Sequence, residues 1–296
     1  MTISCFNLTL KSPSAFDATH ALPLRIFAAF LLLGSAWGLS ASFSLAAQTI
    51  ATAPRQPAAV ELLTQQLRSL GGADAWQHVK GAKVSGIEKS THEQGDIPFT
   101  WEDHWEQHYK MYRDSSHGGK RRRLLQDADN PTNHPEDSAN SSSTTKLPTP
   151  PQFDPGTALL SHLPGAALEH ILKGREYEIS LSMPHTELSS SVAGLECVHI
   201  LKIPKAATYA PVNIFVCSSP QDHRPAVAII ELRDLIDPSH KLYEAIWYKS
   251  FRENDGGLIV PVEVEIRKPH GRTDTYLFNG MSLNPELDKA FVGGQQ

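Results

Sequence analysis

The stretch that decides the fold is GGLIVPVEVEIRKPHGRTDTYLFNG, which runs from Gly256 to Gly280. Its first half alternates apolar and polar residues, the two-residue period of a half-buried strand. A turn follows at KPHGR, residues 268–272, and a second short strand is predicted to end at Phe278. The stretch therefore predicts a hairpin with one apolar face, and it contains no recognisable nucleophile motif or metal-ligand cluster. Its apolar positions are Val260, Val262, Val264 and Ile266.

Similar segments recur on the N-terminal side of this hairpin and bring the predicted total to about nine strands. Strands do not alternate with long helices, so the sheet is expected to be mostly antiparallel. A sheet of this size curls or closes instead of staying flat. The sequence thus predicts an α+β fold, mostly antiparallel β, in which one curved sheet holds a few helices in its concave face. The other strand segments are 82–90, 99–114, 176–183, 195–203, 212–217, 226–234 and 242–251.

Two regions are predicted to supply the helices. In VELLTQQLRSL, residues 60–70, the apolar stripe of an amphipathic helix is formed by Val60, Leu63, Leu67 and Leu70. Gly71 and Gly72 end this helix, and Asp74 is expected to cap a short second turn. One or two further short helices, split at Pro164, are predicted in residues 158–174.

The segment FTWEDHWEQHYKMYRD, residues 99–114, is the richest in chemically interesting side chains. His104 and His108 are four apart, as zinc ligands on a helix would be, but the H-E-x-x-H order is absent. A single strand with solvated histidines fits better. Its aromatic face is either ordinary core or the wall of an apolar cavity. That face carries Phe99, Trp101, Trp105, Tyr109 and Met111.

Composition and the N-terminal region bound the class of protein. The chain has 296 residues, a net charge of -5 and one basic run, residues 120–123, which has a loop-like context and is expected to be a solvated edge. No nucleic-acid partner is therefore expected. Residues 1–47 resemble a signal peptide, followed by a flexible lead-in at 48–59. An uncleaved membrane anchor is the alternative, because the apolar run at 26–47 approaches spanning length.

Export changes the expected state of the cysteines. Removal of the leader takes Cys5 with it and leaves Cys197 and Cys217, which lie in two predicted strands and are equidistant from position 207 between them. Residues placed in this way face each other in an antiparallel hairpin, within reach of a disulfide. An oxidising compartment favours that bond, and two buried free thiols are the alternative.

A polar stretch interrupts the strand pattern at residues 126–151. It is rich in Ser, Asn, Asp and Pro and nearly devoid of apolar residues, so it is predicted to be a disordered loop within a single domain at residues 60–292. The alternative is a linker between two domains, but the segment before it is short for a separate core.

The order of elements resembles that of LolA/LolB-like periplasmic proteins. The similarity lies in LLTQQLRSLGGADAWQHVKGAKVSGI near the start and in YKSFRENDGGLIVPVEVEIRK near the end. It continues in YLFNGMSLNPELDKAFV, whose matching residues are Asn284, Asp288 and Phe291. The resemblance implies a highly curved, half-open β-barrel with helices in its mouth, a cavity for acyl chains and a Gram-negative-type envelope location. By position, Arg113 is the nearest counterpart of the carriers' cavity arginine.

Three functions follow as hypotheses. The first is a non-enzymatic periplasmic or secreted protein that binds a hydrophobic ligand, such as a lipid or a lipoprotein acyl chain, with only transient membrane contact unless the leader is retained. The second is an envelope sensor or protein-interaction module. The third, a secreted hydrolase, lacks a G-x-S-x-G motif, and we expect neither catalytic residues, nor a metal, nor a cofactor. The cavity candidates are Leu63, Leu67, Leu70, Trp101, Trp105, Tyr109, Met111 and Arg113.

Overall fold

A single antiparallel sheet of twelve strands organises the described part of the computed structural model. The chain divides into Met1–Thr49 and Ile50–Gln296, and every described residue belongs to the second unit. The expected leader, residues 1–47, lies outside the described residues. The structure describes residues 53–106, 110–127, 134–135, 155–184, 188–202, 212–233, 237 and 240–286.

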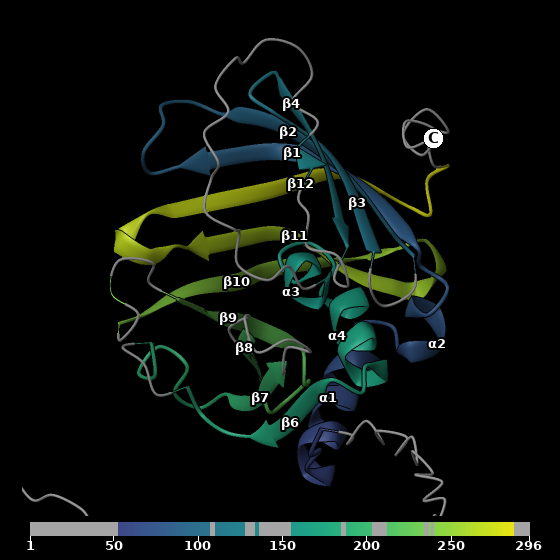
Figure 1. The fold of residues 1–296 in the computed structure, drawn as a ribbon, viewed down its shortest axis with the longest axis vertical. Helices are drawn as coiled ribbons and strands as arrows, with labels where there is room; N and C mark the ends of the chain where they lie inside the picture. Colours follow the sequence, from purple (N-terminus) through teal and green to yellow (C-terminus); the bar gives the residue numbers. More distant parts are fainter. Residues whose placement is uncertain are drawn as a thin grey trace, which may run out of the picture. The chain divides into compact units, whose positions relative to one another are not determined.

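The strands follow the order β5-β4-β3-β2-β1-β12-β11-β10-β9-β8-β7-β6. The chain thus enters at the middle of the sheet, runs to one edge, crosses to the other edge and returns to the middle (Figure 1). The strands are β1 Gly81–Ser90, β2 Ile97–Glu106, β3 Lys110–His117, β4 Lys120–Asp127, β5 His134–Pro135, β6 Tyr177–Leu181, β7 Glu196–Lys202, β8 Val212–Ser218, β9 Pro225–Arg233, β10 Lys241–Asn254, β11 Leu258–Arg267 and β12 Thr273–Leu283.

The sheet curves around its helices, which lie on the concave side (Figure 1). The first of them, α1 at Pro57–Ser69, begins at a proline, which suits a first helical turn. Between β5 and β6 the chain crosses the concave face through α3 and α4, and the Tyr248 hydroxyl donates to the Leu160 carbonyl at 2.7 Å between these helices. The expected half-open, curved sheet with helices in its concavity is confirmed. The remaining helices are α2 Ala73–Trp76, α3 Pro155–Leu159 and α4 Pro164–Lys173.

One hydrophobic cluster joins the helices to the inner face of the sheet. It contains the inner residues of α1, most of α4 and alternate residues of strands from β1 to β12. The stripe predicted for the first helix is confirmed at Leu63, Leu67 and Leu70, all of which are fully buried. A smaller cluster on β7 to β10 contains Phe215 and Ile229 and forms a separate group.

The strand count and one strand boundary were predicted wrongly. The sheet has twelve described strands instead of about nine, and residues 99–114 form a hairpin of β2 and β3 instead of one strand. Trp105 pairs with Met111 across that hairpin. Two residues six apart in the sequence fall on the same face of a continuous strand, so the alternation of apolar and polar residues gives no sign that the strand ends at residue 106.

Several local predictions also need correction. The basic run at 120–123 belongs to β4 and not to a loop. Asp74 lies in the first turn of α2, whose N-cap is Gly72 without a side-chain cap. His104 is half-buried and hydrogen-bonded to Glu102 at 3.0 Å, so it is not simply solvated. Of the predicted loop at 126–151, residues 126–127 end β4 and residues 134–135 form β5, and the remainder lies outside the described residues.

The two remaining cysteines of the expected mature chain face each other across β7 and β8. Cys197 pairs with Cys217 in the strand register, and their Sγ atoms lie 2.05 Å apart. The bond closes a loop with a sequence separation of 20 residues. Loop closure of this kind restricts the unfolded chain and stabilises the fold in the chain-entropy model.

Candidate functional site

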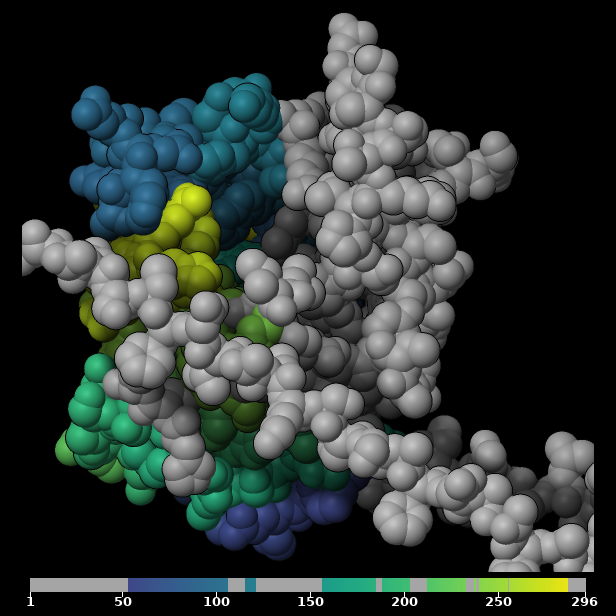
Figure 2. All heavy atoms as spheres, turned by 60° about the vertical axis from the view of Figure 1, so that its left-hand side comes forward, coloured from purple at the N-terminus to yellow at the C-terminus, as the bar shows by residue number. Residues whose placement is uncertain are grey.

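An open groove of about 680 Å³ lies between α1 and the C-terminal end of edge strand β6. We call it the α1–β6 groove. Its volume falls within the range of small-ligand sites. In Figure 2 the surface of α1, in purple, borders that of the green strands at this end of the described unit. The groove is lined by Ala58, Glu61, Leu62, Gln65, Leu181, Ser182, Met183, Glu196, Cys197 and His223.

Hydrogen bonds fix the helical wall of this groove. Gln66 is fully buried and donates from Nε2 to Ser218 Oγ at 3.0 Å. One turn further on, Ser69 Oγ lies 3.3 Å from the carbonyl oxygen of His223, in the β8–β9 turn. At the other end of the helix, Arg55 donates to the Leu172 carbonyl of α4 at 2.9 Å. These hydrogen bonds fix the helical wall of the groove against β8, the β8–β9 turn and α4.

Apolar side chains are unusually exposed at the strand wall. Among the described residues, Leu181 and Met183 are the large hydrophobic residues with highly exposed side chains, at 45% and 41%. The sequence predicted them on the same apolar face as Tyr177 and Ile179, which are buried. The apolar face extends beyond the part of β6 that α1 covers. Leu181 and Met183, at its end, therefore line the groove instead of packing in the core.

The rim of the groove is acidic. The lining includes two glutamates, Glu61 and Glu196, and neither lysine nor arginine. Glu61 forms an exposed ion pair with Arg68 at 3.3 Å, and Glu196 lies 3.7 Å from Nδ1 of His223. His223 has a positive φ of 54°, an uncommon conformation for a residue other than glycine. Apolar walls with carboxylates at the rim suit an apolar ligand that carries positive charge.

The residues proposed from the sequence as a cavity lining lie elsewhere. Trp101 and Trp105 pack against the hydrophobic core, and Leu63, Leu67 and Leu70 are part of it. Trp101 has Phe99 at 4.6 Å and Tyr276 at 5.2 Å between ring centroids. Tyr109 lies outside the described residues, and for Met111 and Arg113 only the backbone in β3 is described.

A buried polar pair lies beneath this aromatic group. Nε2 of His162 lies 2.8 Å from Oδ2 of Asp103, and both side chains are 1% exposed. Ser161 Oγ lies 3.0 Å from Nδ1 of the same ring. A hydroxyl, an imidazole and a carboxylate thus stand in a row, but the imidazole and carboxylate are enclosed in the core. The pair ties the α3–α4 crossing to β2, and we assign it a structural role.

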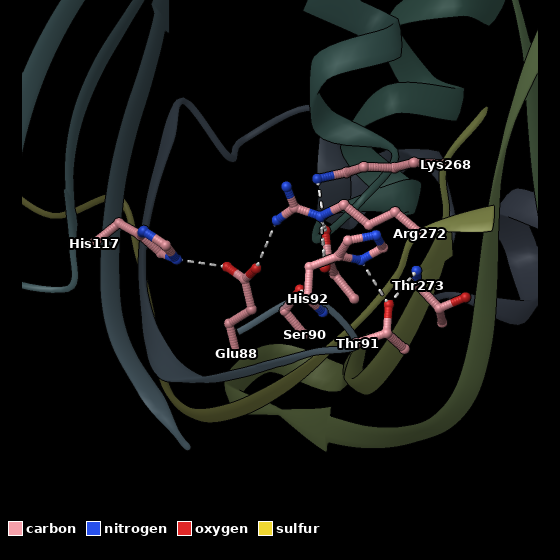
Figure 3. A network of polar contacts seen from close by, with 9 residues as sticks. Glu88, Ser90, Thr91, His92, His117, Lys268, Arg272 and Thr273 are labelled. Atoms are coloured by element: carbon pink, nitrogen blue, oxygen red, sulfur yellow. Dashed lines mark hydrogen bonds and ion pairs between the residues drawn. The ribbon is translucent and has the colours of Figure 1, made fainter. Parts of the chain in front are cut away.

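A larger polar network lies at one end of β1, β3 and β12 (Figure 3). His117 of β3 donates to the buried Glu88 of β1 at 2.7 Å, and Arg272 approaches the same carboxylate at 3.6 Å. Arg272 also donates from Nε to Asp274 at 3.0 Å, and Lys268 reaches Asp274 at 2.7 Å. These contacts link β1, β3 and the β11–β12 turn.

Burial raises the pKa of the acids in and beside this network, and at Asp274 the neighbouring cations outweigh it. Burial raises the pKa of Asp274, but hydrogen bonds from Lys268, Ser90 and Arg272 outweigh burial and hold its pKa below the ordinary value of 3.8. The pKa of Glu244 is raised, mainly because burial disfavours its charged form. The pKa of Tyr276 is also raised, first by burial and then by the charge of Glu88. The network therefore holds Asp274 ionised between cations.

Acidification is expected to weaken this end of the sheet through Asp274. The folded-state pKa lies below the unfolded value, so the stabilisation is present above about pH 4 and is lost as the pH falls through the lower, folded-state value. Urea unfolding between pH 2.5 and 7 measures this loss. We expect Asp274→Asn to flatten the acid side of the stability curve, and Asp96→Asn at an exposed turn is the matched control. An equally steep curve for Asp274→Asn would contradict the assignment.

Within the described ranges, no group of three or more His, Cys, Asp or Glu side chains is arranged to hold a metal ion. No described helix is both long and apolar enough to cross a membrane.

Comparison with known proteins gives loose structural similarity. No family model and no curated protein matches the chain. A LolA superfamily protein from Nitrosomonas europaea has a TM-score of 0.46 at 13% identity, covering 79% of this chain and 96% of that one. An outer-membrane lipoprotein-sorting protein domain from Vibrio parahaemolyticus gives 0.43 at 9%, covering 79% and 95%. Both similarities are loose and concern the fold alone.

Proposed function

We propose that this chain is a non-enzymatic binding protein of the cell envelope that holds a hydrophobic ligand in the α1–β6 groove. The observation that carries the proposal is the exposure of Leu181 and Met183 beside Leu62 in a groove of ligand size. Exposed apolar side chains that line a concavity gain free energy when a ligand removes them from water, at about 25 cal/mol per Å².

Two further observations support the proposal. The walls are fixed by hydrogen bonds such as that of Gln66 with Ser218, so binding requires little ordering of the protein. The disulfide between Cys197 and Cys217 is of a kind that persists in oxidising compartments, which supports a periplasmic or secreted location. The sequence resemblance implied an acyl chain of a lipid or lipoprotein as the ligand, and a linear alkyl chain is therefore the first probe.

Charge placed in the groove is expected to weaken binding. Fluorescence titration with an uncharged fluorescent dodecyl amide should show saturable binding, and Met183→Glu should raise its Kd at least about ten-fold. The reason is that a carboxylate must then be desolvated against an alkyl chain. Met183 is exposed, so this substitution spares the core.

The matched control is Ala193→Glu, which adds the same charge at an exposed position outside the groove lining. It should bind the probe as the unmodified chain does. The proposed function would be contradicted if the probe showed no saturable binding, or if Met183→Glu bound it with the same Kd as the unmodified chain.

A further inference from the structure

Strand β6 lies at an edge of the sheet, and the chain covers part of that edge with its own N-terminal segment. Residues 53–56 run beside β6, with Arg55 bridged in parallel to Ile179. Ile179 donates its N–H to the Pro54 carbonyl at 3.1 Å and accepts from the N–H of Gln56 at 2.8 Å. This edge is therefore built to pair with an extended segment.

The covering segment leaves the edge where the groove begins. At Pro57 the chain turns into α1, and the Gln56 side chain completes the pairing by accepting from the Leu181 N–H at 2.8 Å. Backbone groups of alternate residues point the same way in an antiparallel ladder. The register pairs Ile179 with Ile200 and Leu181 with Val198, so the Leu181 carbonyl points outward as that of Ile179 does. The outward row of backbone groups thus continues into the α1–β6 groove.

We propose that the occupant of the groove is an extended peptide segment, apolar on one face and basic on the other, that adds to the β6 edge. This inference rests on the proposed function and names its ligand class. The peptide would place apolar side chains between Leu62 and Met183 and donate an N–H to the Leu181 carbonyl. An acyl chain has no donor and would desolvate that carbonyl without a hydrogen bond, which is unfavourable.

The charge of the rim supports the same choice. Glu61 and Glu196 attract lysine or arginine side chains and repel the phosphate or carboxylate head of an anionic lipid. Glu61 is only partly compensated by the exposed Arg68, because exposed ion pairs are weak. A basic, extended peptide therefore fits both the backbone and the charge of the site.

Competition against the dodecyl probe tests the inference. An eight-residue peptide of alternating valine and lysine should displace the probe. The same peptide with glutamate in place of lysine should bind at least about ten-fold more weakly. A version N-methylated on alternate residues, which keeps the side chains but loses N–H donors, should also bind at least about ten-fold more weakly. In the variant Glu61→Lys/Glu196→Lys, the preference between lysine and glutamate peptides should reverse. Glu93→Lys, at an exposed turn outside the groove, should keep the original preference.

The outcomes separate the inference from the function on which it rests. Displacement by the lysine peptide, lost on N-methylation, supports both. Probe binding without displacement by any peptide overturns the peptide inference and leaves a groove for alkyl chains. Equal displacement by the methylated peptide also overturns it, because edge pairing is then absent. If neither the probe nor the peptides bind, both proposals fall.

Discussion

Asp103→Ala is expected to lower the free energy of unfolding by about 3 to 5 kcal/mol, the usual effect of removing one partner from a buried pair. The substitution leaves the His162 ring enclosed without the carboxylate that lies 2.8 Å from its Nε2. It also loosens the α3–α4 crossing from β2. The free energy of unfolding of a domain is only about 5 to 15 kcal/mol, so the substitution removes a large fraction of it. Urea unfolding followed by circular dichroism measures the change.

A second variant separates the cost of the orphaned ring from loss of packing. In Asp103→Leu/His162→Leu both polar groups are replaced by apolar ones of similar size, and such replacements are often close to neutral. We therefore expect the double variant to be more stable than Asp103→Ala. Asp96→Ala, at an exposed turn, should change stability by less than about 0.5 kcal/mol. A double variant less stable than the single one would show that the pair itself, and not the orphaned ring, carries the stabilisation.

Much of the fold follows from local patterns in the sequence. The strands on either side of residue 268 alternate with period two, and the Gly71–Gly72 break ends α1 close to where predicted. The missed hairpin between β2 and β3 contains neither glycine nor proline at 107–109. The alternation of apolar and polar residues also continues through 107–109, so neither residue type nor period marked the boundary.

The candidate site was less predictable because it is assembled from distant segments. The α1–β6 groove joins residues 58–65 with residues 181–183 and His223, and no spacing in the sequence relates them. Leu181 lies on the same face of β6 as Tyr177 and Ile179. Whether a residue on this face is buried depends on how far α1 extends along β6, which the alternation in the sequence does not reveal. The buried pair did leave a signal: Asp103 interrupts an aromatic face, and a buried acid requires a polar partner. His162 could not be named as that partner from sequence alone.

Gly165→Val is expected to lower the free energy of unfolding by about 3 kcal/mol or more, the upper part of the range for overpacked cores. A Cβ at Gly165, in the first turn of α4, would lie 2.2 Å from Cε2 of Trp76 and 2.3 Å from its Nε1. The indole has little room to yield, because it is 1% exposed and donates from Nε1 to the Leu70 carbonyl at 2.8 Å. The added methyl groups must therefore displace α4 from α2 and from the end of α1.

A double-mutant cycle tests whether the indole is the cause. In the unmodified chain Gly165→Ala should already destabilise by about 1 to 3 kcal/mol, since even one methyl group meets the ring. In a Trp76→Leu background the ring is gone, and the same substitution should cost less than about 0.5 kcal/mol. The coupling between the two sites would then be at least about 0.5 kcal/mol in the direction of rescue. Strict additivity would instead mean that the glycine is needed for the backbone of α4 and not for the close approach of Trp76, and the steric account of this helix contact would be wrong.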